Sequence, residues 1–174
     1  MIYSLRRKFI LISAISVLAV FAVIYGVIFV TSCIQLDRTM DTLTEAIATG
    51  GGRFPELAAV RPLLRGWLDA GVITEETPFS TRFFTVWLDK EGHILRVDTD
   101  AISSITEAQT QPYAEAALKN GNPRGWVEDY RYRVFAAGKD TAIVFVNGAM
   151  NRTLSRRFLL TALAVLAGSG LVIL

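Results

Sequence analysis

The hydrophobic positions of the chain gather in one unbroken run near the N-terminus. Residues 9–34 read FILISAISVLAVFAVIYGVIFVTSCI and include no charged, proline or amide residue. An α-helix rises about 1.5 Å per residue, so about 20 apolar residues cross a bilayer core of roughly 30 Å. The apolar part of a signal peptide is shorter, about 7–15 residues, and ends in a small-residue cleavage site that does not follow this run. The run therefore predicts a retained transmembrane helix.

A second apolar stretch closes the sequence. Residues 158–174 read FLLTALAVLAGSGLVIL and are also free of charge. Their length lies at the lower limit for a membrane span. We expect a second transmembrane helix that is incomplete in this sequence, and we expect the natural protein to continue beyond Leu174.

Apolar residues at helical spacing follow the first run directly. The intervals between them are four, three and four residues, with polar residues in between, and the positions are Leu36, Met40, Leu43 and Ile47. This spacing is typical of a coiled-coil seam, but also of an amphipathic helix packed on its own domain. Both interpretations stay open: a dimer seam that transmits motion, or intradomain packing. Three consecutive glycines, residues 50–52, predict the end of this helix.

Short stretches rich in aromatic and β-branched residues predict a sheet further along. Residues 82–89 and 94–100 form an expected hairpin around the turn at 90–92. A helix is expected within residues 105–118 and is closed by Asn120-Gly121. The remaining strands are expected at 125–129, 132–136 and 141–147, with turns at 130–131 and 138–140. The pattern predicts an α+β fold, an antiparallel sheet with flanking helices between two transmembrane helices.

Charge adds an orientation to this picture. Arg6, Arg7 and Lys8 precede the first span, whereas residues 35–157 hold 15 Lys/Arg and 16 Asp/Glu. A near-neutral domain gives no electrostatic reason to expect nucleic acid as a partner. The basic cluster predicts a cytoplasmic N-terminus, and long domains translocate largely regardless of their charge. We therefore expect a multi-pass protein of the plasma membrane, with a cytoplasmic tip at 1–8, spans at 9–34 and 158–174, and an extracytoplasmic domain at 35–157.

Candidate chemistry is sparse. One cysteine excludes an intrachain disulfide. The single histidine, His93, lies in the predicted hairpin turn and has no second His or Cys with which to share a metal. No Ser/His/Asp or Cys/His arrangement is possible with a histidine in that position. We therefore predict no catalytic residue and no metal site.

The best candidates for ligand binding lie on the predicted strands. Arg131 and Arg133 share one strand face, and Tyr130 and Tyr132 share the other. Paired arginines suit a carboxylate or phosphate ligand. Asp98 lies on a predicted strand as well and could contact a ligand amine or a cation. The candidate ligand-binding residues are Arg131, Arg133, Tyr132 and Asp98, and the plainer alternative is a solvated polar outer face.

Several stretches together resemble a known family. They are the opening SLRRKFILISAISVL, then GGRFPE, the central ETPFSTRFFTVWLDKEGHILRVDTD, and the later GWVEDYRYRVF and TAIVFVNGAMNRTLSRRFLL. This pattern resembles the extracytoplasmic sensor region of bacterial membrane sensor histidine kinases, with a PAS-like or Cache-like domain. The resemblance implies a two-component receptor: an outer sensor, two spans, a cytoplasmic dimerisation helix with a phospho-accepting histidine, and an ATP-binding domain.

The chain departs from that pattern in its catalytic part. His93 lies on the outer side in the predicted topology, and the sequence has no glycine-rich nucleotide box. The kinase activity of the family is therefore assigned to no residue, and no cofactor is expected here; ATP and Mg²⁺ belong to the missing kinase domains. We expect the sensor and membrane portion of a two-component kinase, as a homodimer that signals to a response regulator and detects an unknown stimulus. The alternatives are the sensory half of a chemotaxis receptor or cyclase, and a stand-alone small membrane binding protein.

Overall fold

The computed structural model describes residues 2–55 and 73–149, together with residues 153, 157, 160, 161 and 164. It separates into two units. One comprises Met1–Leu36 with Asn151–Leu174, and the other comprises Asp37–Met150. The first helix, α1 (Ile2–Thr49), is continuous and contributes its last turns to the second unit.

The apolar part of α1 has the composition of a membrane span. Among the described residues, one helical segment, Ile15–Thr49, is long and apolar enough to cross a membrane. Its most apolar stretch is not buried by the rest of the protein. A core helix of a soluble protein would be buried instead. The hydroxyl groups of Ser16 and Thr31 donate hydrogen bonds to the carbonyl oxygens four residues earlier, at 2.9 and 2.8 Å. Such bonds satisfy polar side chains where no water is present. The predicted second span, residues 158–174, lies almost wholly outside the described residues.

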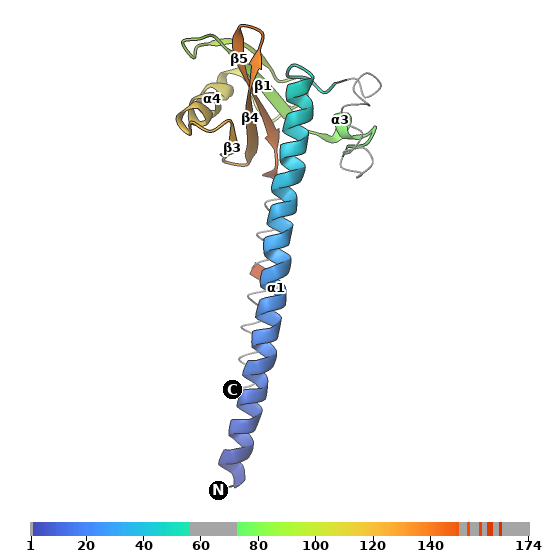
Figure 1. Cartoon of the computed structure of the whole chain (residues 1–174), viewed down its shortest axis with the longest axis vertical. Helices are drawn as coiled ribbons and strands as arrows, with labels where there is room; N and C mark the ends of the chain where they lie inside the picture. The colour runs from blue at the N-terminus through green and yellow to red at the C-terminus, as the bar shows by residue number, and fades with distance from the viewer. Residues whose placement is uncertain are drawn as a thin grey trace. The chain divides into compact units, whose positions relative to one another are not determined.

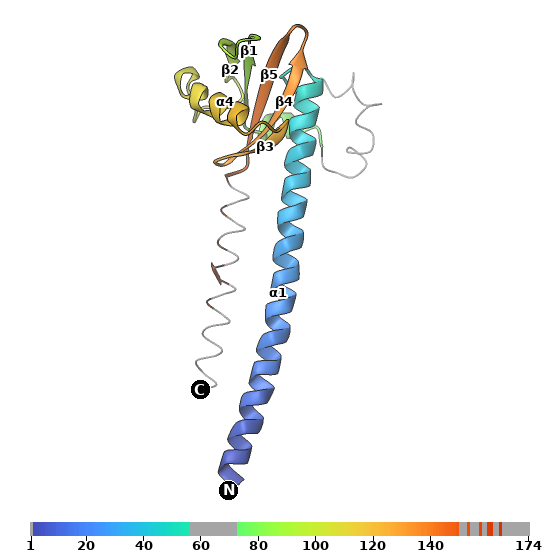
Figure 2. The same ribbon diagram turned by 60° about the vertical axis from the view of Figure 1, so that its left-hand side comes forward.

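The second unit is built on a five-stranded antiparallel sheet, which confirms the predicted α+β class. The strand order is β2-β1-β5-β4-β3, and every neighbouring pair is antiparallel. A short helix, α3 (Thr77–Ser80), precedes the sheet. The strands are β1 (Phe83–Leu88), β2 (Ile94–Asp98), β3 (Arg124–Val127), β4 (Tyr130–Ala137) and β5 (Asp140–Asn147). Within this unit the sheet lies between the teal last turns of α1 and the yellow helix α4 (Thr110–Lys119), as two views show (Figure 1, Figure 2).

One local prediction differs from the structure, and another is confirmed with a narrower range. Residues 130–131 were expected to form a turn, but they begin β4, and the turn between β3 and β4 is formed by Glu128 and Asp129. The turn carries no glycine, so the sequence around it gives no marker of the reversal. The helix expected within 105–118 begins at Thr110 and follows the short 3-10 helix η1 (Glu107–Gln109). Pro112 then falls in the first turn of α4, where its missing N–H is harmless.

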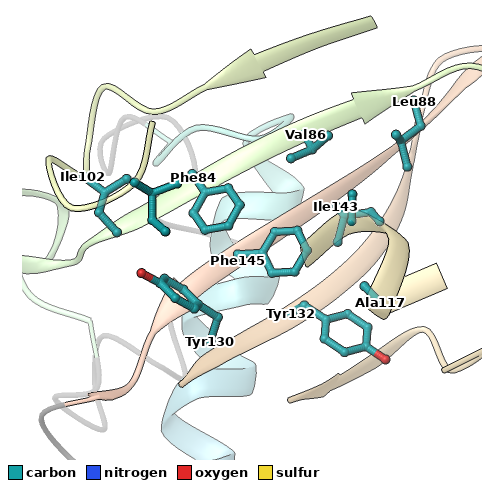
Figure 3. Packing of buried hydrophobic residues seen from close by; sticks show 11 residues of the cluster. Phe84, Val86, Leu88, Ile102, Ala117, Tyr130, Tyr132, Ile143 and Phe145 are labelled. Carbon is teal, nitrogen blue, oxygen red and sulfur yellow. The ribbon is translucent and has the colours of Figure 1, made fainter. Parts of the chain in front are cut away.

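The main hydrophobic core fills the face of the sheet under α4. Phe84 and Phe145 stack with ring centroids 4.7 Å apart, and both are fully buried. Figure 3 shows that the labelled side chains on the strands point to one side of the sheet, where Ala117 of α4 also lies. Ala114 and Ala117 are the buried residues that α4 presents to this core, together with Thr110. Small side chains on the helix leave room for the aromatic rings of the sheet.

The end of α1 is fixed against the opposite face by a glycine. Gly52 has φ +98°, and its N–H donates to the carbonyl oxygen of Ile47 at 2.9 Å. The Thr85 hydroxyl donates to the carbonyl oxygen of Gly52 at 2.8 Å. A Cβ at residue 52 would lie 2.6 Å from the Trp87 ring. Only glycine can adopt this backbone angle and also leave room for the Trp87 ring. The predicted helix end is therefore confirmed, and its contact with the sheet explains why glycine is needed there.

Candidate functional site

The most organised polar arrangement joins α1 to the sheet. Asp37, Asp41 and Glu45 are spaced four residues apart, so their carboxylates follow one stripe of the helix. Strands β3 and β4 present basic and indole groups to the same stripe. We call this set the polar layer, and its members are Asp37, Asp41, Glu45, Arg124, Trp126, Arg131 and Arg133.

A two-pronged ion pair occupies the centre of the polar layer. The Nε of Arg131 donates to Oδ1 of Asp41 at 2.8 Å, and its NH2 group donates to Oδ2 at 2.9 Å. The two side chains are 11% and 21% exposed. Arg124 approaches the same carboxylate at 3.5 Å. Two parallel charge-assisted bonds fix both distance and orientation, so this pair holds β4 to α1 in one geometry.

The two ends of the polar layer make further polar contacts between α1 and the strands. The indole N–H of Trp126 donates to Asp37 at 2.9 Å, and the Arg131 guanidinium lies 5.5 Å from the Trp126 ring. At the other end, the NH2 group of Arg133 donates to Glu45 at 2.8 Å. In the register of the sheet, Trp126 lies directly opposite Arg131. The layer therefore spans three successive turns of α1 and two strands.

Apolar residues of α1 flank the polar layer. Met40, Leu43 and Ile47 are 5%, 8% and 0% exposed within a single chain, whereas Leu36 is half-buried. Of the two interpretations of this seam, the structure supports packing within the domain. These three side chains are buried within the single chain, and the dimer seam stays a prediction. The helical spacing in the sequence could not distinguish a dimer seam from packing within the domain, because each of them requires an apolar stripe along one side of the helix.

The four predicted ligand-binding residues are not brought together. Arg131 and Arg133 do share a face, as predicted, but that face is covered by α1 and is not a solvated outer surface. Tyr132 is fully buried on the opposite face, in the core under α4. Asp98 lies on β2, which is separated from β4 by both β1 and β5, and its carboxylate accepts a hydrogen bond from Nε of Arg53 at 2.8 Å.

The sequence held a signal for the polar layer that periodicity alone did not reveal. The helix carries acidic residues at intervals of four, and β4 carries basic residues at an interval of two. Each interval keeps its charges on one side of its element. Matching the two would have paired segments about 90 residues apart.

The hairpin turn around His93 is stabilised by Asp89. The backbone N–H of His93 donates to Oδ1 of Asp89 at 2.8 Å, and its ring Nδ1 lies 3.2 Å from Oδ2. The hydrogen bond from the His93 backbone lowers the pKa of the Asp89 carboxyl below its usual value. The possible ligand atoms of Asp89, Glu91 and His93 lie within 4.8 Å of one another, at the surface. The contacts of His93 with Asp89 explain why these three side chains lie close together: they stabilise the hairpin turn.

Comparisons with protein-family models, with curated proteins and with solved structures found no match to this chain. The function is therefore argued from the geometry of the polar layer and of α1.

Proposed function

We propose that this chain is the membrane-anchored sensor part of a signalling receptor, with the sheet domain outside the membrane and α1 as the element that receives the signal. The observation that carries the proposal is that one helix supplies two things. Its first part is apolar enough to span a bilayer, and its last turns form the polar layer with β3 and β4. A change in the position of β4 would therefore move the last turns of α1, the same helix whose first part is apolar enough to span a bilayer.

The physical basis of such signalling is a difference in binding energy between two arrangements. A stimulus shifts α1 only if it binds two positions of the sheet relative to the last turns of α1 unequally. Packed interfaces tend to switch between discrete arrangements and do not deform continuously. Because the Asp41–Arg131 pair fixes one geometry, it favours one of these arrangements in the unstimulated domain.

The finer parts of the proposal rest on the sequence. The cluster Arg6, Arg7 and Lys8 favours a cytoplasmic N-terminus. The resemblance to sensor histidine kinases supports a PAS-like or Cache-like domain and a cytoplasmic kinase acting on a response regulator. An antiparallel sheet flanked by helices is the architecture that this resemblance implies. A homodimer is also implied by the resemblance, and its interface stays a prediction.

Membrane topology tests the proposal directly. In a Cys33→Ser background, Lys139→Cys places a thiol in the exposed turn between β4 and β5, and Ser4→Cys places one before the first span. A membrane-impermeant maleimide should label the cysteine at 139 in intact cells or spheroplasts, and the one at 4 only after lysis. Labelling with the reverse pattern, or labelling of both only after lysis, would contradict an extracytoplasmic sensor.

A further inference from the structure

The turn between β1 and β2 brings together three side chains of the kinds that bind metal ions. Asp89 follows β1, His93 precedes β2, and Glu91 lies between them in the sequence. One oxygen or nitrogen atom from each side chain lies within 4.8 Å of the other two. The sequence alone predicts no metal here, because His93 has no second His or Cys beside it. The structure brings two carboxylates to the imidazole instead.

Hydrogen bonds within the turn hold two of these groups in place. The backbone N–H of Asp89 donates to the carbonyl oxygen of His93 at 2.9 Å. In return, the backbone N–H of His93 donates to Oδ1 of Asp89 at 2.8 Å. Oδ2 of the same carboxylate faces the imidazole, with Nδ1 of His93 at 3.2 Å. The backbone therefore places one carboxylate oxygen beside one ring nitrogen before any ion arrives.

The spacing of these two atoms fits a metal coordination shell. Zn²⁺ binds imidazole nitrogen and carboxylate oxygen at about 2.0–2.2 Å in tetrahedral geometry, which places neighbouring ligand atoms about 3.3–3.6 Å apart. The observed separation of 3.2 Å needs little change to reach this range. Glu91 is exposed, so its side chain can turn between rotamers to close the remaining distance.

Both carboxylates are available to a cation. Among the described residues, neither Asp89 nor Glu91 forms an ion pair with a lysine or an arginine. The hydrogen bond from the His93 backbone keeps the pKa of Asp89 below its usual value, so this carboxylate is ionised at neutral pH. The His93 side chain is 79% exposed, and an ion can reach it from solution.

We propose that Asp89, Glu91 and His93 bind a divalent transition-metal ion of the zinc type, which accepts both nitrogen and oxygen ligands. An imidazole ligand favours such ions over Mg²⁺ and Ca²⁺, which prefer oxygen ligands alone. Three protein ligands leave the remaining position of the ion to water. His93 also lines a pocket of about 210 Å³ against α4, which offers room beside the imidazole. The site is a property of the hairpin and does not depend on the proposed sensor function.

The single histidine of the chain allows the site to be observed directly. The full chain, without a histidine tag, is labelled with ¹³C at histidine Cε1 and studied by NMR in detergent micelles. Zn²⁺ should shift the one ring signal until one equivalent is bound, and a chelator should reverse the shift. Mg²⁺ at the same concentrations should leave the signal in place. A signal that ignores Zn²⁺, or that responds equally to Mg²⁺, would overturn the inference.

Two substitutions test whether the three side chains act together, with calorimetry of Zn²⁺ binding as the measurement. His93→Asn removes the imidazole but keeps the backbone N–H that donates to Asp89, and Zn²⁺ affinity should fall at least about tenfold. Glu91→Gln removes one carboxylate at an exposed position and should weaken binding about tenfold. Glu107→Gln, which removes an exposed carboxylate in η1 outside this turn, is the matched control and should bind Zn²⁺ as the unmodified chain does.

Melting temperatures separate a lost site from a lost fold. Zn²⁺ should raise the melting temperature of the unmodified chain and of Glu107→Gln, because a ligand of the folded state stabilises that state, and it should not raise that of His93→Asn. Without metal, all variants should melt as the unmodified chain does. Unchanged Zn²⁺ affinity in Glu91→Gln would show binding by a lone surface histidine and would contradict the site. Unchanged affinity in His93→Asn would place the bound ion elsewhere and would contradict it as well.

Discussion

The pairing of Asp41 with Arg131 decides how strongly the end of α1 is attached to the sheet. Both side chains are largely buried, and the guanidinium uses two of its donors on one carboxylate. Such a pair adds little over a well-packed apolar contact, but breaking it leaves one charge buried without its partner. Its removal is therefore expected to destabilise the domain more than the loss of a surface ion pair does.

Asp41→Asn tests this expectation. Because the pair is not fully buried, we expect a loss of about 2–3 kcal/mol in the free energy of unfolding, measured by denaturant titration in detergent. Glu75→Gln changes the net charge equally at an exposed position and should change stability by less than about 0.5 kcal/mol. Equal effects of the two variants would show that the pair is solvated.

Gly52 offers a second single-residue prediction with a natural control. Gly52→Ala forces a Cβ to within 2.6 Å of Trp87 at a positive φ, and we expect a loss of about 2–4 kcal/mol. Gly51 also has a positive φ, but a Cβ there meets nothing within 4 Å. Gly51→Ala should therefore lose only the backbone part, about 1–2 kcal/mol. The difference between the two unfolding free energies measures the contact between the end of α1 and the sheet.

The raised pKa of Tyr113 predicts a pH dependence. A group whose pKa is higher in the folded state stabilises that state below its unfolded pKa, and the contribution is lost as pH rises through the folded value. For Tyr113 this window runs from 10.0 to about 12. The unmodified chain should lose stability as the pH rises from 10.0 to about 12, and Tyr113→Phe should lack the part of this loss that comes from Tyr113. An unchanged pH profile of stability would show that Tyr113 is not shielded from water as the structure has it, because burial is the main cause of its raised pKa and the hydrogen bond to Glu128 is the second.

Among the helices and strands, the sequence predicted those features that depend on residues close together in the chain. The hairpin of β1 and β2 followed from aromatic and β-branched residues on both sides of a glycine turn, and the end of α1 followed from its three glycines. The turn between β3 and β4 was misplaced, because Glu128 adopts a positive φ that its residue type does not indicate. The partners of Arg131 and Arg133 could not be inferred from local pattern, since they lie 90 and 88 residues earlier.

The apolar stripe of α1 gives a prediction at the same scale. In a Cys33→Ser background, single cysteines at Met40 and Leu43 should form no more crosslinks between chains than a cysteine at the exposed Arg38, because Met40 and Leu43 are buried within the single chain. Crosslinking in native membranes with a short bifunctional maleimide measures this. Strong crosslinks at 40 and 43 but not at 38 would restore the dimer seam at the expense of intradomain packing.

In the whole molecule, α1 joins a part that is long and apolar enough to cross a membrane to a folded domain. An apolar helix with exposed side chains needs a lipid environment, whereas the last turns of the same helix are part of a packed core. The polar layer is the device that ties the two roles together. If it is weakened, the sheet should keep its own core under α4 while the end of α1 loosens.

Hydrogen–deuterium exchange over residues 37–49, measured on the full chain in nanodiscs, shows whether the polar layer holds the end of α1 to the sheet. The charge reversals Asp41→Arg and Arg131→Asp should each speed exchange in this segment, and the double variant, which restores an opposite pair, should recover part of the protection. Exchange in β5 should change little in all three. Equal protection of residues 37–49 in the unmodified chain and in both single variants would show that the polar layer does not hold α1 to the sheet.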